Sequence, residues 1–378
     1  MEAFQTPPDQ MPRRISMEHA EIEHETAERF AHALAGWEAR DFERIRIHTK
    51  AEKWRSASAI QKAIRRGHVA TALTHAQALH DFEPRYLLRR RLAIIALEDR
   101  AHGDEKLVAE CLWASRAAQD WDEDTKLRGL LMLVNRLCGG TKDRSPCDAG
   151  VAATWHWDWA DHRGEWDGLP TEALVEIVLS PGEHPVSRVL ALGIVAARRK
   201  QGLLLDVARQ LGISPLQRYI AVGGAVAEGL GVPFLVTSAL IRKCAPKEVS
   251  AEPDEPIVDL PSIGPWPSYC LDQHNWDGRR AVLYALATVP ALRRYCERWG
   301  VEKGRGPAVV QELLFRVESD TVDSRLIYPQ SRELRRLASE SCLNWAGLPG
   351  EALDEGLEVL RANMYRLHQA RRRVLGVA

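Results

Sequence analysis

Apolar residues recur at helical spacing along nearly the whole chain. One such face lies within residues 69–79, where apolar side chains stand three and four positions apart, namely Val69, Ala72, Leu73, Ala76 and Leu79. Further helical patterns begin at Ser58, Glu83, Asp104, Leu127, Thr171, Ser187 and Ser214, and later ones cover residues 278–289, 307–317, 331–345 and 351–375. No alternation of apolar and polar residues reaches the length of a strand. The sequence therefore predicts an all-α protein, a multi-helix bundle.

Local signals place several helix starts. Ser58 with Gln61, and Ser214 with Gln217, have the spacing of a capping box. Asp104 is expected to cap the helix that follows it. The connections between the first helices are short, which favours antiparallel neighbours in one bundle.

Two segments interrupt the helical pattern. Residues 141–169 are rich in Gly, Asp and Trp, and we expect a long ordered loop or a short hairpin there. Residues 246–267 hold six prolines and five acidic residues, which predicts a linker or an extended crossing. We therefore expect an acidic helical segment at 1–50, a helical bundle at 51–145, the Trp-rich loop with further helices at 146–250, and the Pro-rich crossing with a C-terminal helical lobe at 251–378.

Charge and cysteine content exclude several classes of protein. Lys and Arg total 51 and Asp and Glu total 52, a formal net charge of −1, which argues against a polybasic protein but not against a local basic groove. None of the seven cysteines has CxxC spacing, so neither a zinc ribbon nor a thiol redox motif is indicated. We expect reduced, mostly buried thiols in a cytoplasmic protein.

Hydropathy does not indicate a membrane protein. Residues 1–17 contain three prolines and no apolar core, so they do not read as a signal peptide. The best candidate for a span is 220–241, which is barely long enough and contains Glu228 and Pro233. A buried pair of helices with a break at 229–233 is expected instead.

Residues 54–104 resemble a known helical region. Residues 58–67 have the pattern S-A-x-x-K-x-x-R-x-G, residues 83–90 have E-P-x-Y-x-x-R-R, and residues 96–99 have A-x-E-D. A shorter echo, ending in C-A-P-K, lies at 239–247. These features are similar to the helices that follow the ATPase module in clamp-loader-like AAA+ ATPases of the replication-associated recombination (RarA/WRN-interacting) type.

The resemblance implies a collar-like helical bundle, which in that family serves oligomerisation and placement near replication forks. It covers about fifty residues and the short echo. The phosphate-binding pattern G-x-x-x-x-G-K-[ST] does not occur in the sequence. We therefore expect no ATPase activity and no cofactor.

Basic residues gather on two of the expected helices. Lys62, Arg65 and Arg66 close the first, and Arg89 and Arg90 lie on the second. Guanidinium groups on one helix face suit phosphate oxygens, which makes these five residues candidates for DNA binding. The alternative is that they form structural ion pairs with nearby acidic residues, namely Glu83, Glu98 and Asp99.

The densest polar cluster follows the Pro-rich segment, at residues 269–280. Asp272 and His274 are candidate catalytic residues, with Asp272 orienting His274 or serving as a general base itself. The candidate DNA-binding residues here are two tryptophans for stacking on an unpaired base and two arginines for phosphate, namely Trp266, Trp276, Arg279 and Arg280. The alternative is an ordinary helix cap made by Asn275 or Asp277.

The Trp-rich segment 155–162 contains two histidines and two aspartates, but their spacing matches no familiar metal site. We expect no metal there. Tryptophans that anchor the segment on the bundle are the favoured interpretation, and a loop that stacks on DNA is a further one.

Three functions remain open from the sequence. The first is a DNA-associated helical protein without ATPase activity, acting in replication, repair or defence against mobile elements. Its expected partners are duplex or single-stranded DNA, replication-fork proteins and a second copy of the chain, with no membrane. The second is an enzyme acting on DNA bases, glycosylase-like, that uses the 266–280 loop. The third is a protein–protein adaptor.

Overall fold

The computed structural model describes residues 13–38, 41–198, 201–226, 229–253 and 261–377, and α-helices make up most of these ranges. The first helices are α1 (Arg13–Ala35), α2 (Lys50–Arg65), α3 (Val69–Phe82), α4 (Leu92–Asp99), α5 (Glu105–Ala117), α6 (Glu123–Cys138), α7 (Ser145–Trp155), α8 (Trp157–Trp166) and α9 (Thr171–Leu179). The later ones are α10 (Pro185–Ala197), α11 (Gln201–Gln210), α12 (Pro215–Val226), α13 (Gly231–Ile241), α14 (Trp276–Thr288), α15 (Pro290–Arg298), α16 (Gly306–Leu314), α17 (Ser331–Asn344), α18 (Gly350–Ala362) and α19 (Met364–Leu375). The prediction of an all-α protein is confirmed.

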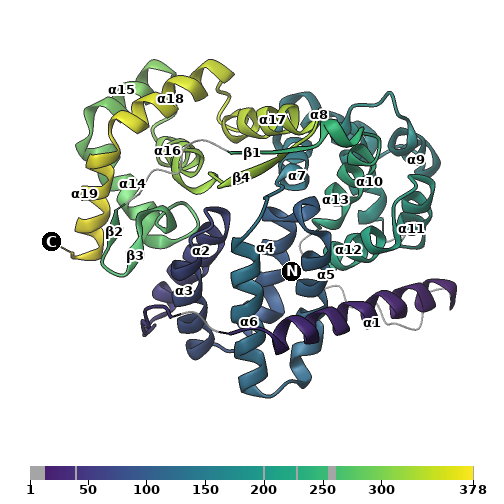
Figure 1. The fold of residues 1–378 in the computed structure, drawn as a ribbon. Coiled ribbons are helices and arrows are strands. Elements are labelled where there is room, and N and C mark those ends of the chain that lie inside the picture. The colour runs from purple at the N-terminus through teal and green to yellow at the C-terminus, as the bar shows by residue number, and fades with distance from the viewer. Residues whose placement is uncertain (1–12, 39–40, 199–200, 227–228, 254–260, 378) are drawn as a thin grey trace.

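Two large clusters of buried apolar side chains divide the molecule into two lobes. One cluster consists of residues between 22 and 239, together with two leucines of α17, and forms the core of the N-terminal lobe. The other lies between residues 281 and 370 and forms the core of the C-terminal lobe. Figure 1 shows α14, α15, α16, α18 and α19 together at one end of the molecule, with α9 to α11 at the other. Helix α17 belongs to both lobes, because Leu334 and Leu337 pack in the first cluster and Leu343 packs in the second.

The three segment boundaries expected from the sequence can be compared with the positions of the two clusters. The boundary at 250–251 falls between the two clusters. Those at 50–51 and 145–146 stay predictions, because the larger cluster runs across both.

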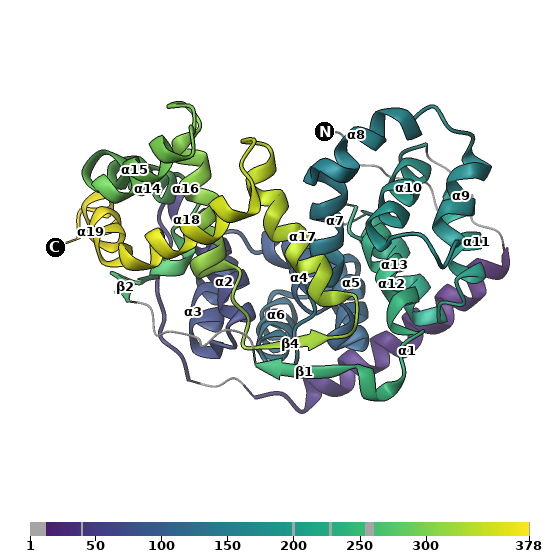
Figure 2. The same ribbon diagram turned by 90° about the horizontal axis from the view of Figure 1, so that it is seen from above.

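Two short antiparallel β pairs lie where the chain passes between the lobes. Strand β1 (Ser250–Pro253) pairs with β4 (Ser324–Ile327), and β2 (Ser262–Ile263) pairs with β3 (Trp266–Pro267). Figure 2 shows β1 and β4 side by side at the edge of the molecule. The described parts of the Pro-rich segment are therefore largely extended, as expected, while residues 254–260 lie outside the described ranges.

The Trp-rich segment is helical, which corrects the expectation of a long loop or hairpin at 141–169. Helices α7 and α8 occupy most of it, and His156 separates them. The imidazole Nδ1 of His156 accepts a hydrogen bond of 3.3 Å from the backbone N–H of Asp158 and so caps α8. Trp159 and Trp166 pack against the core of the N-terminal lobe, and burial of one face stabilises a short helix that its composition alone would not.

The start of α2 also differs from the prediction. Ser58 lies inside the helix, and its hydroxyl donates a hydrogen bond of 3.0 Å to the carbonyl oxygen of Cys270. The true cap is Thr49, whose hydroxyl accepts from the backbone N–H of Glu52 at 3.2 Å, while the Glu52 carboxylate accepts from the N–H of Thr49 at 3.1 Å. Because this capping box lies farther upstream, the helix begins there and continues through Ser58.

Other helix ends agree with the sequence. Asp104 caps α5 with its carboxylate, and Ser214 and Gln217 exchange the two hydrogen bonds of a capping box before α12. The end of α12 and the whole of α13 lie within 220–241, which agrees with the expected pair of helices, although α13 begins at Gly231, inside the expected break. Helix α10 begins at Pro185, slightly earlier than its pattern indicated.

The C-terminal helices are more numerous than the pattern predicts. Residues 351–375 form α18 and α19, with a break at Asn363, in place of one long helix. Helix α15 has no counterpart among the expected helices; it begins at Pro290, a residue well suited to a first helical turn.

Cysteine burial and helix hydropathy agree with the sequence. All seven cysteines are free, and five of them are buried. Within the described ranges, none of the helices combines the length and the apolar character needed to cross a bilayer.

Candidate functional site: the cleft between the lobes

A buried ion pair joins α2 to the 269–280 segment. The ammonium of Lys62 lies 2.5 Å from Oδ2 of Asp272 and 2.7 Å from the hydroxyl of Ser58. Both charged side chains are almost completely buried. A buried charge needs such partners, because transfer from water to the interior is costly without them. The pair therefore fixes the segment on the N-terminal lobe.

Asp272 in turn orients His274. Its Oδ1 accepts a hydrogen bond of 3.0 Å from the backbone N–H of His274, and its Oδ2 lies 3.1 Å from the imidazole Nδ1. Burial alone would raise the pKa of Asp272, but the charge of Lys62 and the hydrogen bond from His274 outweigh it and hold the pKa well below its usual range. The carboxylate is therefore ionised, which favours a proton on Nδ1 and leaves Nε2 of the half-exposed His274 as an acceptor.

The backbone around this pair is held from several sides. The side chain of Asn275 caps α14 by accepting a hydrogen bond of 2.8 Å from the N–H of Gly278. The guanidinium of Arg371 donates twice to the carbonyl oxygen of Leu271, at 3.1 and 2.7 Å. The helix-cap alternative from the sequence is thus correct for Asn275, and it exists together with the Asp272–His274 contact.

Beside this pair lies a cleft between the two lobes, with a cavity volume of about 770 Å³. Its walls come from α2, the π-helical segment at 87–91, α7, the loop at 273–274, α16 and α17. Both lobes therefore contribute, and the cleft is large enough for a ligand of nucleotide size.

Exposed aromatic side chains line this cleft. Trp54 on α2 is 50% exposed, Trp155 at the end of α7 is 57% exposed, and Trp345, directly after α17, is 37% exposed. Tyr86 completes the group, with its ring 6.0 Å from that of Trp54 and nearly perpendicular to it. Large apolar rings that stay in contact with water around one cleft are typical of a binding surface for a flat ligand.

Glu312 adds a carboxyl group to the same cleft. Burial raises the pKa of Glu312, although nearby Arg316 and a hydrogen bond with Gln273 oppose the shift. Burial thus favours the protonated form of this carboxyl group more than water does. The cleft thus holds the imidazole of His274 together with a carboxyl group whose protonated form burial favours.

The basic residues of α2 are buried in ion pairs and not exposed on a face. Lys62, Arg65 and Arg66 each keep only a few percent of their surface. Arg65 donates to Oδ1 of Asp99 at 2.6 Å, and Arg66 donates to the carbonyl oxygen of Glu318. The ion-pair alternative is therefore correct for Arg65, whereas Lys62 pairs with Asp272, a partner that the sequence did not indicate. These three side chains do not form an exposed phosphate-binding face.

A cluster of buried arginines and aspartates forms the floor between the lobes. Arg144 contacts Asp99 and lies 2.9 Å from Oδ1 of Asp320, and Arg316 lies 2.8 Å from Oδ2 of the same aspartate. Burial opposes ionisation of Asp320, but Arg144 and Arg316 outweigh it and hold the pKa of Asp320 well below its usual range. These charges join the lobes and are matched to one another.

The remaining candidate residues lie in different surroundings. Trp266 is buried and stacks on His75, with ring centroids 5.2 Å apart, so it is not available to a base. Trp276 is 68% exposed but does not line the cleft. Arg279 and Arg280 are exposed on α14, where Arg279 donates to the carbonyl oxygen of Gln273 at 2.7 Å. The side chains of Arg89 and Arg90 lie outside what the structure describes.

The described residues contain no group of three or more His, Cys, Asp or Glu side chains placed to hold a metal ion. In the Trp-rich segment, His162 lies 3.2 Å from Glu165, and His156 lies 3.4 Å from Glu340 on α17. These two histidines therefore pair with nearby carboxylate groups of the protein.

Sequence reasoning identified Asp272 and His274 but missed the aromatic lining of the cleft. Trp54 stands just before the buried stretch of α2, and Trp345 stands just after α17. A tryptophan at the end of an amphipathic helix, off its buried face, is the signal that was available.

No family model, curated protein or solved structure matches this chain.

Proposed function

We propose that this protein binds DNA and receives an unpaired base in the cleft between its lobes. The observation that carries the proposal is the set of three exposed tryptophans around one cavity, placed there by three separate helices, namely Trp54, Trp155 and Trp345. Stacking of a base on an aromatic ring contributes roughly 1–3 kcal/mol and tolerates every base. The resemblance of residues 54–104 to a collar found near replication forks supports the same setting.

Binding of a fluorescently labelled single-stranded oligonucleotide tests this proposal. Replacing Trp54 and Trp345 together by Ala should weaken binding about tenfold or more, since roughly 1.4 kcal/mol corresponds to tenfold. The matched control is Trp276→Ala, which removes a tryptophan that is more exposed than either but lies outside the cleft. Absence of binding by the unaltered protein, or equal loss in the control, contradicts the proposal and favours a protein–protein adaptor.

Base excision is a second candidate function, favoured by the presence of His274 and Glu312 in the same cleft. In that reaction His274 Nε2 takes a proton from water, the water oxygen bonds to C1′ of the sugar, and the bond from C1′ to the base nitrogen breaks. Glu312 gives its proton to the departing base. Asp272 stabilises the imidazolium through Nδ1 and stays buried.

Incubation with oligonucleotides that carry damaged or deaminated bases, followed by cleavage at abasic sites, tests this second function. His274→Gln should abolish product while binding of single-stranded DNA remains within about twofold. If no abasic product forms with any base and binding depends on the tryptophans, the first function stands without the second.

A further inference from the structure

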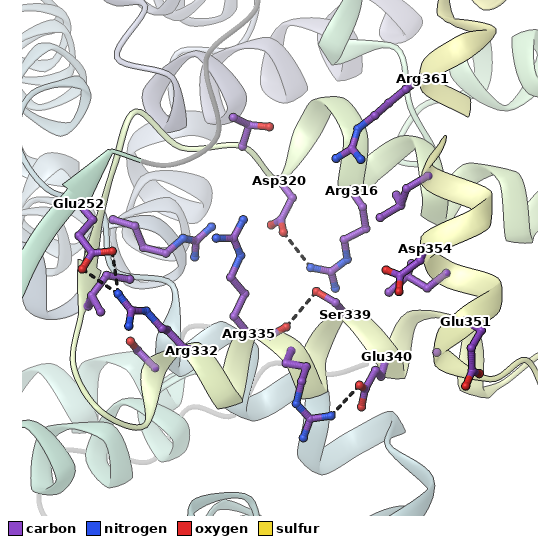
Figure 3. Close-up of a pocket in the computed structure, with 18 of the residues that line it drawn as sticks. Glu252, Arg316, Asp320, Arg332, Arg335, Ser339, Glu340, Glu351, Asp354 and Arg361 are labelled. Carbon is purple, nitrogen blue, oxygen red and sulfur yellow. Dashed lines mark hydrogen bonds and ion pairs between the residues drawn. The ribbon is translucent and has the colours of Figure 1, made fainter. Parts of the chain in front are cut away.

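A second hollow lies beyond the buried arginine–aspartate floor, between α17, α18 and the β1–β4 pair, with a cavity volume of about 1130 Å³. Six arginines line it, namely Arg316, Arg325, Arg332, Arg335, Arg336 and Arg361, together with five acidic residues, namely Glu252, Asp320, Glu340, Glu351 and Asp354. Figure 3 shows Arg316, Arg335 and Arg361 reaching from three elements toward the same space. We call this cavity the arginine hollow.

Carboxylates of the protein also line the arginine hollow, and the ion pairs at its outer side are exposed. Arg332 lies 2.8 Å from Oε1 of Glu252, and Arg336 lies 2.6 Å from Oε1 of Glu340 (Figure 3). The arginine side chains are 67% and 58% exposed. Ion pairs this exposed to solvent contribute little to stability, so these guanidinium groups can exchange a carboxylate for a phosphate at little cost.

The spacing of the arginines suits a chain of phosphates better than a single one. Arg335 and Arg336 stand three and four positions beyond Arg332 on α17, one helix turn away, which places the Cβ atom of each about 5–6 Å from that of Arg332. Arg361 approaches the same hollow from α18. Guanidinium groups at several points along a trough match a sugar–phosphate backbone.

The arginine hollow adjoins the cleft at Arg316, which lines both cavities. Its Nη1 is paired with Asp320, whereas its buried Nε has no hydrogen-bond partner in the described structure. A nucleic-acid strand with one base in the cleft therefore reaches the arginine hollow on the other side of Arg316.

We propose that the arginine hollow binds the sugar–phosphate backbone of the nucleic-acid strand whose base occupies the cleft. The proposal rests on the proposed function and adds where the phosphates lie. It assigns backbone contacts to Arg332, Arg335 and Arg336 on α17, in place of the buried basic residues of α2.

The salt dependence of binding to labelled oligothymidylate tests the proposal. Arg332→Gln with Arg336→Gln should lower the slope of log affinity against log salt by about 1.4, since each phosphate contact on a single strand contributes about 0.7. The control is Arg209→Gln with Arg298→Gln, which removes two other solvent-exposed, carboxylate-paired arginines that do not line the hollow. Its slope should match that of the unaltered protein. Thermal melts of both variants should agree, because all four side chains are exposed.

The outcomes separate this proposal from the proposed function. An unchanged slope in the hollow variant, with binding still lost on replacing Trp54 and Trp345, overturns the backbone site and leaves the cleft intact. A lowered slope with no effect of the tryptophans supports the backbone site and contradicts base stacking. Equal slopes in hollow and control variants, both below the unaltered protein, show nonspecific attraction and overturn the site. Binding of tripolyphosphate as tight as that of the oligonucleotide shows a phosphate site only and overturns the assignment to nucleic acid.

Discussion

Lys62 and Asp272 lie 210 residues apart in the sequence and form an ion pair with a distance of 2.5 Å, almost without exposure to solvent. The pair connects α2 of the N-terminal lobe to the segment that precedes α14. The positive charge of Lys62 also stabilises the ionised form of Asp272, the carboxylate that orients His274. Stability of the lobe junction and geometry of the candidate site therefore depend on the same contact.

Removal of one partner from this pair should be costly. Lys62→Met leaves Asp272 charged and buried, and we expect a loss of roughly 3–5 kcal/mol in the free energy of unfolding. The double variant Lys62→Met with Asp272→Leu removes both charges and should recover most of that loss. Urea unfolding at neutral pH measures both, and a Lys62→Met variant as stable as the unaltered protein contradicts a buried pair.

The two tryptophans of the 266–280 segment should differ strongly in the effect of truncation on stability. Trp266 is buried against His75, so Trp266→Ala should lower the free energy of unfolding by roughly 3–5 kcal/mol. Trp276 is exposed, so Trp276→Ala should change it by less than about 0.5 kcal/mol. Thermal melts of the two variants side by side check the difference, and similar melts contradict it.

These two tryptophans also show what the sequence can and cannot predict. The helical fold class and the positions of several helix caps can be predicted from residues three or four positions apart, as at Asp104 and at Ser214 with Gln217. Asp272 and His274 were identifiable because they are close in sequence. By contrast, whether a Trp is buried depends on what folds over it, and Trp266 packs against His75, which comes from a distant part of the chain.

The same limit applies to the basic residues of α2. Their spacing matches an exposed phosphate-binding face, but their partners come from distant parts of the chain: Asp272 for Lys62, and the carbonyl oxygen of Glu318 for Arg66. The lining of the cleft is likewise assembled from α2, α7 and α17. Only tertiary structure brings these elements together, so local periodicity does not indicate the cleft.

His75 should make the stability of the protein depend on pH. Burial lowers the pKa of His75 to about 4, although the carbonyl of Pro265 opposes the shift. Between about pH 6.5 and 4 the unfolded chain binds a proton at this residue and the folded chain does not. The free energy of unfolding should therefore fall as pH is lowered through this range, by on the order of 3 kcal/mol in total from this residue.

Comparison with His75→Gln isolates that contribution. Glutamine does not titrate, so the variant should lose less stability than the unaltered protein between pH 7 and pH 4.5, whatever its stability at pH 7. Urea unfolding at the two pH values gives the difference. If the two proteins lose the same free energy of unfolding between these pH values, folding does not lower the pKa of His75 and the prediction is wrong.

The backbone of Asp272 packs closely against Gly278 in the first turn of α14. A methyl group at position 278 should therefore displace the loop that contains Asp272. A Cβ atom at this position would lie 2.1 Å from the carbonyl oxygen of Asp272 and 2.4 Å from its backbone nitrogen. Because both are backbone atoms, the clash can be relieved only if the whole loop shifts. Gly278→Ala should therefore cost roughly 1–3 kcal/mol and shift Asp272 away from Lys62. The control is Gly193→Ala on α10, where nothing lies within 4 Å of the added Cβ and alanine should stabilise the helix by about 0.5–1 kcal/mol. Opposite signs in urea unfolding support close packing of the loop, whereas a stabilised Gly278→Ala variant shows that the segment has room to move and that His274 is not held in place by it.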